Sequence, residues 1–442
     1  MKKFIIPACV AVFAAALHAA TPQAAFDAAI IPGAEYFGFF DAKTSPFAKE
    51  VRDIAIKFGE EMAGVENNPA AGVYKNLEKF EDLMKSNGLG EESVEKAAFS
   101  VDYSKWFAVV GDALDEKPDA AAKLSIGDIG ILIAYLLKEP LAEDFSETFV
   151  HKIINLFSEG AQVSWLETGA FAHGGAKGTT VTITFPEELL PVHMAMMRRE
   201  MSEFFSIKPF ALAVLADNKV LLLGREEDVK AAIDRANAGK KTEFSPVAKK
   251  LMEGRFAGKS ALEHEGAFFF VMPDVVRRGI GKIEKDVLAG GFLPAGMGVA
   301  LEAAKHCAGL RIAMNADEKM DTVINIVLDT PERAALFRDF MDITALNLAK
   351  MALFQASGKN TPFAQSLKAV AEDDSVSLHC TVTAADYKAL LDFGKKMEEK
   401  QRQQREQMRQ LFEEKVKQLD EKPEDPQKPL VIEEAEVNEG WN

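Results

Sequence analysis

Long apolar runs are missing from this 442-residue chain beyond its first twenty residues. The longest later candidate runs from Leu124 to Leu137, has fourteen residues and is interrupted by Asp128. A membrane-spanning helix needs about 20 apolar residues. We therefore expect no transmembrane segment in the mature chain, and we interpret 124–137 as a buried helix.

Positive charge is also scarce. The chain has 52 Lys and Arg residues against 68 Asp and Glu residues, and its formal net charge is −16. An acidic protein is repelled by nucleic acid and by anionic lipid surfaces, so we expect neither as a partner.

Catalytic signatures are missing as well. The sequence has neither the helix motif of metalloproteases nor a Gly-x-Ser-x-Gly turn. Gly254–Ser260 resembles a phosphate-binding loop, but it is one residue short and follows a helix instead of a strand, so we interpret it as a linker turn. We therefore expect a protein that is not an enzyme and has no cofactor. A hydrolase without a recognisable motif is the third hypothesis.

Cysteine is rare. Of three cysteines, Cys9 lies in the first twenty residues, and Cys307 and Cys380 each follow a histidine. Cys and His are zinc ligands, but neighbouring side chains of a strand point to opposite faces, so we expect no metal site. In an oxidising compartment, a disulfide between Cys307 and Cys380 is the prediction, and two separate buried thiols are the alternative.

The first twenty residues have the pattern of a signal peptide. Lys2 and Lys3 precede an apolar run, and Ala19 and Ala20 close it with small side chains. We expect export to the periplasm or cell envelope, with cleavage after Ala19 or Ala20. Removal of the two lysines changes the formal charge from −16 to −18.

Two similar stretches suggest an internal repeat. Gly33–Asp41 and Gly266–Asp274 both open on Gly-Ala, carry aromatic residues at matching positions and close on Asp. Each is typical of a buried strand that leads into a helix. We therefore predict two related halves, with each of these strands inside the sheet of its own half.

Local signals define several further elements. Phe210–Ala216 and Lys219–Gly224 flank Asp217-Asn218, which tolerates the positive φ of a tight hairpin turn. Helix 226–238 should end at Gly239. Thr330-Pro331-Glu332 is typical of a helix start.

These patterns resemble a family of exported bacterial two-repeat proteins of unassigned function. The resemblance covers most of residues 31–392 and lies in Ile31–Ala34, the hairpin 210–224, the helix 226–238 and the segment 242–251. It implies an α+β fold and an extracytoplasmic setting, and it transfers no catalytic residue.

We expect an α+β fold whose two related halves have mainly antiparallel sheets flanked by helices. The expected boundaries are a signal peptide at 1–20, a first repeat at 21–260 with helical insertions, a second repeat at 261–392, a charged projecting helix at 393–420 and a disordered acidic tail at 421–442.

The first functional hypothesis is a non-catalytic envelope protein that binds a protein partner, or itself, through its C-terminal helix. The expected docking residues are Met408, Leu411, Phe412, Val416 and Leu419. The alternative is a carrier of an apolar small molecule or lipid between sheet and helices. Its expected lid is the flexible loop with Gly290, Gly291, Phe292, Leu293, Pro294, Gly296 and Gly298.

Overall fold

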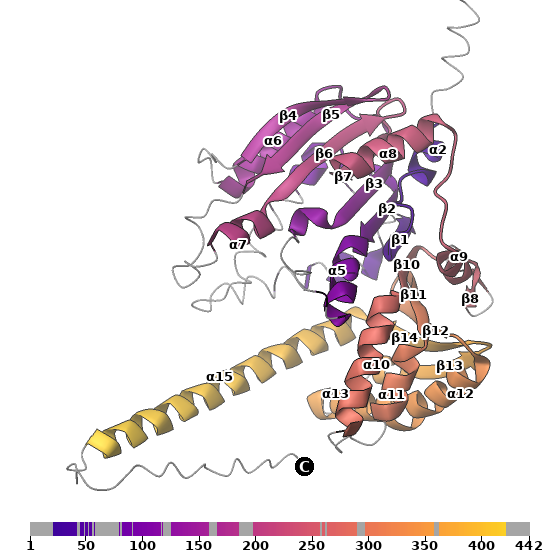
Figure 1. Cartoon of the computed structure of the whole chain (residues 1–442). Coiled ribbons are helices and arrows are strands. Elements are labelled where there is room, and N and C mark those ends of the chain that lie inside the picture. Colours follow the sequence, from indigo (N-terminus) through magenta and orange to yellow (C-terminus); the bar gives the residue numbers. More distant parts are fainter. Residues whose placement is uncertain are drawn as a thin grey trace, which may run out of the picture. The chain divides into compact units, whose positions relative to one another are not determined.

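The computed structural model describes residues 21–41, parts of 45–57, 79, 82–115 except 91, 117, 125–158, 166–184, 198–256, 259–260, 263–289, 297–357 and 362–420 (Figure 1). The chain divides into a large unit that ends at Lys388 and a small one that begins at Ala389. The expected signal peptide and acidic tail lie outside the described residues.

One antiparallel sheet forms the centre of the large unit, in the order β13-β14-β12-β11-β10-β1-β2-β3-β7-β6-β5-β4. The strands of the first half are β1 Tyr36–Asp41, β2 Val94–Asp102, β3 Gly130–Leu137, β4 Leu166–His173, β5 Ala176–Ile183, β6 Ile207–Leu215 and β7 Val220–Arg225. Those of the second half are β10 Gly266–Val271, β11 Cys307–Ala316, β12 Met320–Leu328, β13 Lys368–Glu372 and β14 Ser375–Val382. Between the halves lies the small hairpin of β8 Arg255–Phe256 and β9 Lys259–Ser260, at the expected linker turn.

Helices cover this sheet, so the protein has an α+β fold. Those of the first half are α2 Pro22–Asp27, α5 Ser104–Leu114, α6 Phe145–Ser158, α7 Arg198–Phe205, α8 Glu226–Asn237 and α9 Pro246–Glu253, with the 3₁₀ turn η1 Ile126–Asp128. Those of the second half are α10 Asp274–Ala289, α11 Met297–Lys305, α12 Pro331–Phe340, the π-helical turn η5 Met341–Ala345, α13 Leu346–Ser357 and α14 Pro362–Ser366. The last helix is α15 Ala384–Asp420.

The strand order is the same in both halves. The first half reads β1-β2-β3-β7-β6 from the centre outward, and the second reads β10-β11-β12-β14-β13. The first half then continues with β5 and β4, which have no counterpart among the described residues of the second half. The prediction that each central strand lies in a separate sheet is wrong, because β1 pairs directly with β10.

Aromatic packing stabilises this junction. Phe37 and Phe269 are paired across it, are fully buried and stack with ring centroids 5.0 Å apart. On the opposite face, a Cβ on Gly38 would lie 2.6 Å from the ring of Phe99 and 2.9 Å from that of Phe268. Glycine at this position therefore lets the two neighbouring rings approach the backbone.

The sequence similarity of Gly33–Asp41 and Gly266–Asp274 does not follow the register of the strands. Gly33 lies in a turn before β1, with φ +80°, whereas Gly266 is the first residue of β10. The sequence similarity therefore locates both strands, but its matching glycines occupy different positions relative to β1 and β10.

Residues 130–137 contradict the predicted buried helix. They form β3, which pairs with β2 and β7 near the middle of the first half. A short apolar run has the same appearance in a buried strand and in a buried helix. Residues 130–137 form a strand because they are hydrogen-bonded to a neighbouring strand on each side and are covered on both faces of the sheet.

The sheet has buried clusters on both faces. One cluster joins alternate strand residues, such as Leu132 and Ala134, to α2, α8 and α9. The other face holds separate clusters under α6 in the first half and α12 in the second.

The segment 21–34 is an integral part of the first face. Thr21 caps α2, and Arg235 of α8 donates hydrogen bonds to the carbonyls of Ala28 (2.9 Å) and Ile30 (2.9 Å). Thr242 donates a further bond to Ile30 (3.1 Å).

Several predictions that rest on local chemistry are confirmed. Asp217 and Asn218 turn the β6–β7 hairpin with φ of 57° and 60°, and Gly239 follows α8 with φ 63°. Thr330 caps α12.

Among the described residues, no helix is long and apolar enough to cross a membrane.

Candidate functional site

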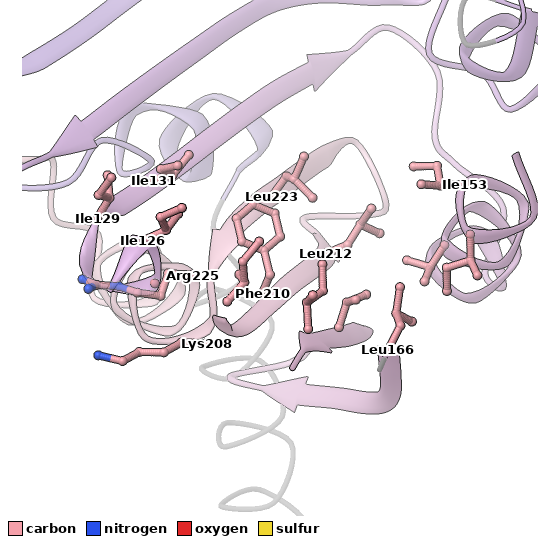
Figure 2. A pocket seen from close by; sticks show the side chains of 16 residues that line it. Ile126, Ile129, Ile131, Ile153, Leu166, Lys208, Phe210, Leu212, Leu223 and Arg225 are labelled. Atoms are coloured by element: carbon pink, nitrogen blue, oxygen red, sulfur yellow. The ribbon is translucent and has the colours of Figure 1, made fainter. Parts of the chain in front are cut away.

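An apolar cavity of about 590 Å³ lies in the first half, between α6, η1 and the sheet (Figure 2). Its size is within the range of about 300–1,000 Å³ that is typical of small-molecule sites. The lining side chains come from η1, β3, α6, β4, β5, β6 and β7, and all but three of those residues are aliphatic or aromatic. They are Ile126, Gly127, Ile129, Ile131, Val150, Ile153, Ile154, Leu166, Val181, Ile183, Ile207, Lys208, Phe210, Leu212, Leu223 and Arg225.

The alternation of side chains along the strands produces the sheet wall of this cavity. On β6, the alternate residues Lys208, Phe210 and Leu212 line the cavity, whereas Ala211 and Ala213 belong to the cluster on the other face. Ile207, the first residue of the strand, also lines the cavity, next to a register irregularity in the pairing with β5. On β7, Leu223 lines the cavity while Leu222 belongs to that other cluster. One face of β6 and β7 is therefore packed core, and the other face is divided between the cavity and the buried cluster under α6, which includes Leu212, Val214 and Leu221.

Helix α6 forms one end of the cavity. Val150, Ile153 and Ile154 line it, while Phe145 and Phe149 stack at 5.1 Å and belong to the neighbouring buried cluster. The helix thus both packs on the sheet and leaves space beside it.

The opposite end of the cavity is polar. Asp128 of η1 forms ion pairs with the ammonium groups of Lys208 and, at 3.6 Å, Lys105. Desolvation raises the pKa of Asp128, but the hydrogen bonds from Lys208 and the Ser125 N–H and the two positive charges outweigh it and lower the pKa. Asp128 is therefore a carboxylate at neutral pH.

Arg225 is the second cation of this end. Its Nε and one terminal nitrogen donate to the two carboxylate oxygens of Asp228, at 2.9 and 3.1 Å. Burial lowers the pKa of Arg225, but the hydrogen bond and charge of Asp228 outweigh it and raise the pKa. Arg225 is thus a charged, internally neutralised part of the wall.

The predicted disulfide does not fit the sheet. Cys307 pairs with Leu328 of β12, whereas Cys380 pairs with Thr322 on the other side of that strand. Two strand spacings and six residues separate them, on the order of 20 Å, and a bridge needs Cα atoms within about 7 Å. Both thiols are free; Cys307 is buried, as the alternative of two separate buried thiols expected, whereas Cys380 is half-buried.

The predicted lid lies mostly outside the described residues, because these omit 290–296. Gly298, its last member, belongs to helix α11. The cavity is lined by residues of the first half, so the predicted lid and the observed cavity belong to different halves.

The predicted docking stripe lies on α15, in the small unit. Met408, Leu411 and Phe412 are exposed by 68%, 56% and 70%. The side chains of Val416 and Leu419 lie outside the described part of the chain, although the helix itself extends past both.

In the part of the chain that the structure describes, no three His, Cys, Asp or Glu side chains are arranged to hold a metal ion. Sequence reasoning missed the cavity itself. The signal that could have indicated it is the pair of hairpin strands, apolar on both faces, beside a charged turn at Asp128.

No protein-family model matches the chain, and no curated protein matches it. It is similar to the solved structure described as crystal form III of TP0453, with a TM-score of 0.35 and 9% sequence identity over 84% of this chain and 97% of that chain. Crystal form I of TP0453 gives a TM-score of 0.32 and 8% identity over 84% and 96% of the two chains. Likeness at this level carries no argument about function.

Proposed function

We propose that this protein is a non-catalytic binding protein for an apolar small molecule, which it holds in the cavity between α6 and the β3–β7–β6–β5 part of the sheet. The observation that carries the proposal is the cavity of about 590 Å³ with an almost wholly aliphatic lining. Protein interiors are otherwise packed with few voids larger than a water molecule. A cavity of this size and chemistry suits the burial of hydrocarbon, which stabilises a complex by about 0.8 kcal/mol per CH₂ group.

The test is the saturable binding of a neutral fluorescent apolar probe, N-phenyl-1-naphthylamine. Leu223 lies in the middle of the cavity wall, so Leu223→Trp should occlude the site and weaken probe binding at least tenfold (Figure 2). The matched control is Leu336→Trp, because Leu336 is an exposed leucine of α12. Equal binding by both variants, or no saturable binding by the native chain, would refute the proposal.

Mass spectrometry of organic extracts of the purified protein gives a second readout. A stoichiometric apolar molecule in the extract supports the carrier function, and its loss in Leu223→Trp assigns it to this cavity.

Docking of a partner through α15 is a second candidate function. Its support is the exposure of Met408, Leu411 and Phe412, whose spacing of three and four residues places them on one helical face. An exposed apolar face of this kind is typical of a helix that binds a groove or a second helix. We infer export to the envelope, from the first twenty residues, as the setting for both functions.

Light scattering and envelope pull-downs test the docking hypothesis. A variant with Gln at Met408, Leu411 and Phe412 should lose self-association or its partner. The matched control carries Ala at the exposed Gln403 and Gln404 of the same helix. Unchanged molar mass and unchanged partners in the Gln variant would exclude this function.

A further inference from the structure

The two charged side chains among the described residues of the cavity lining are both cationic. Figure 2 shows Lys208 and Arg225 at the same end, beside Ile126 and Ile129, and Ile153 and Leu166 at the other end. The cavity lining is therefore polarised, with its two cationic side chains at one end and hydrocarbon at the other.

Lys208 is held in place by its neighbours. Its backbone and stem pack on Gly127, where an added Cβ would lie 2.9 Å from the Lys208 nitrogen and 3.0 Å from its Cγ. Its ammonium bonds Asp128, which is anchored by the Ser125 N–H at 3.0 Å. The position of the lysine thus follows from the fold of η1 and does not need a ligand.

The charge at this end is not balanced by Asp128. Lys208 and Lys105 share this one carboxylate, whereas Arg225 faces two, Asp228 and Glu227, so the cationic groups that are not matched one to one by a carboxylate are the two lysines. An ammonium has three N–H donors, so Lys208 can donate to Asp128 and to a second anion together. Its side chain is 48% exposed, so such an anion can reach it while staying partly hydrated.

Arg225 has a different role. Its side chain is 12% exposed, and Asp228 and Glu227 each lie 2.9 Å from its Nε. These two carboxylates more than neutralise its single charge, so recognition of an external anion depends on Lys208 and Lys105.

We propose that the ligand is a single-chain anionic amphiphile, with its head group on Lys208 and its hydrocarbon chain along Phe210, Leu212 and Leu223 toward α6. The inference rests on the proposed function and adds the ligand's charge and direction. From Lys208 to Leu212 the strand rises by about 13 Å, which suits one extended alkyl chain lying along it. A carboxylate and a phosphate monoester share the required chemistry.

Dodecanoate, dodecyl phosphate and neutral dodecanol are suitable probes, measured by displacement of N-phenyl-1-naphthylamine from the full chain. Dodecanoate should bind more tightly than dodecanol, with an affinity that falls as salt is added. Lys208→Met keeps an unbranched apolar stem and should weaken dodecanoate about tenfold while dodecanol binding stays within about twofold. Lys208→Arg should retain the preference for the anion.

Lys230→Met is the matched control, because Lys230 is also a partly exposed lysine paired with a carboxylate, Glu226, but lies on α8. It should change neither affinity. Tighter binding of dodecyl phosphate than of dodecanoate would identify a phosphate head group, and the reverse a carboxylate.

The two proposals fail separately. If dodecanol binds as tightly as both anions and Lys208→Met weakens neither anion, the charge inference is wrong and the apolar site stands. If none of the three displaces the probe, or the probe itself does not bind, the proposed function is wrong as well.

Discussion

The junction between β1 and β10 makes a quantitative prediction about how the two halves are held together. Phe37 and Phe269 have no exposed surface, pair across the junction and stack at 5.0 Å with an interplanar angle of 20°. Truncation of a buried Phe to Ala typically costs about 3–5 kcal/mol. We expect Phe37→Ala and Phe269→Ala each to lower the free energy of unfolding by about that amount.

The double variant separates this stacking from simple burial. Each ring is part of the other's surroundings, so the second truncation should cost less than the first. The expected coupling energy is about 0.5–1.5 kcal/mol, the value typical of aromatic pairs. Urea denaturation of the native chain, the two single variants and the double variant, followed by circular dichroism, gives the double-mutant cycle. Hydrogen exchange of the β1 and β10 amides shows whether the loss of stability is local.

Phe149→Ala supplies the control. Phe149 is buried and stacks on Phe145, but it belongs to a different cluster, under α6. It should be destabilising and should not couple to Phe269→Ala. Additivity of the Phe37 and Phe269 changes within about 0.3–0.5 kcal/mol would contradict the reasoning, because it would mean that the rings do not support each other.

Three further outcomes are expected. Burial raises the pKa of Glu35, although the Tyr103 N–H donates a hydrogen bond to its carboxylate. The ionised side chain therefore lowers the stability of the folded protein above that raised pKa. Glu35→Gln should raise the melting temperature at about pH 7 and change it little at about pH 4. Desolvation raises the pKa of Cys307 to about 11, so peptide-resolved alkylation should label it slowly in the native protein and rapidly in urea. Rapid native labelling would show that its site opens. A chain that stops after Phe393 should keep the melting temperature of the full chain, because every residue removed belongs to the small unit and the large unit stays whole. A large drop would show that α15 supports the core.

Local chemistry explains which elements the sequence predicted correctly. The β6–β7 hairpin turns at Asp217 and Asn218, and α12 begins at Thr330, because those residues favour these conformations wherever they occur. The fold class follows from many such signals and was therefore predictable.

Predictions that depend on distant partners were less successful. Residues 130–137 are apolar throughout, and only the pairing of β3 with β2 and β7 distinguishes a strand from a helix. The expected disulfide assumed adjacent strands, whereas β12 lies between the strands of Cys307 and Cys380. The local sequence pattern does not determine the order of strands in a sheet, and this explains both the helix predicted for residues 130–137 and the predicted disulfide.

The cavity was unpredictable for a related reason. Phe210, Leu212 and Leu223 have the composition of ordinary core, and a sequence does not show whether core residues meet one another or leave space. A carrier that holds its ligand between sheet and helices was among the hypotheses, but no local pattern indicated which strands and which helix would enclose the space.

The pairing of β1 with β10 also determines when the chain can complete its fold. Tyr36 pairs with Phe270, 234 residues later. Because the chain appears from its N-terminus, β1 is present well before this partner can reach it. During that time one edge of the nascent sheet carries unsatisfied backbone groups beside three phenylalanines, and such an edge is a template for pairing with another chain. The interval between the appearance of these two strands is thus when the protein is most prone to misassembly, and when a chaperone would protect it most.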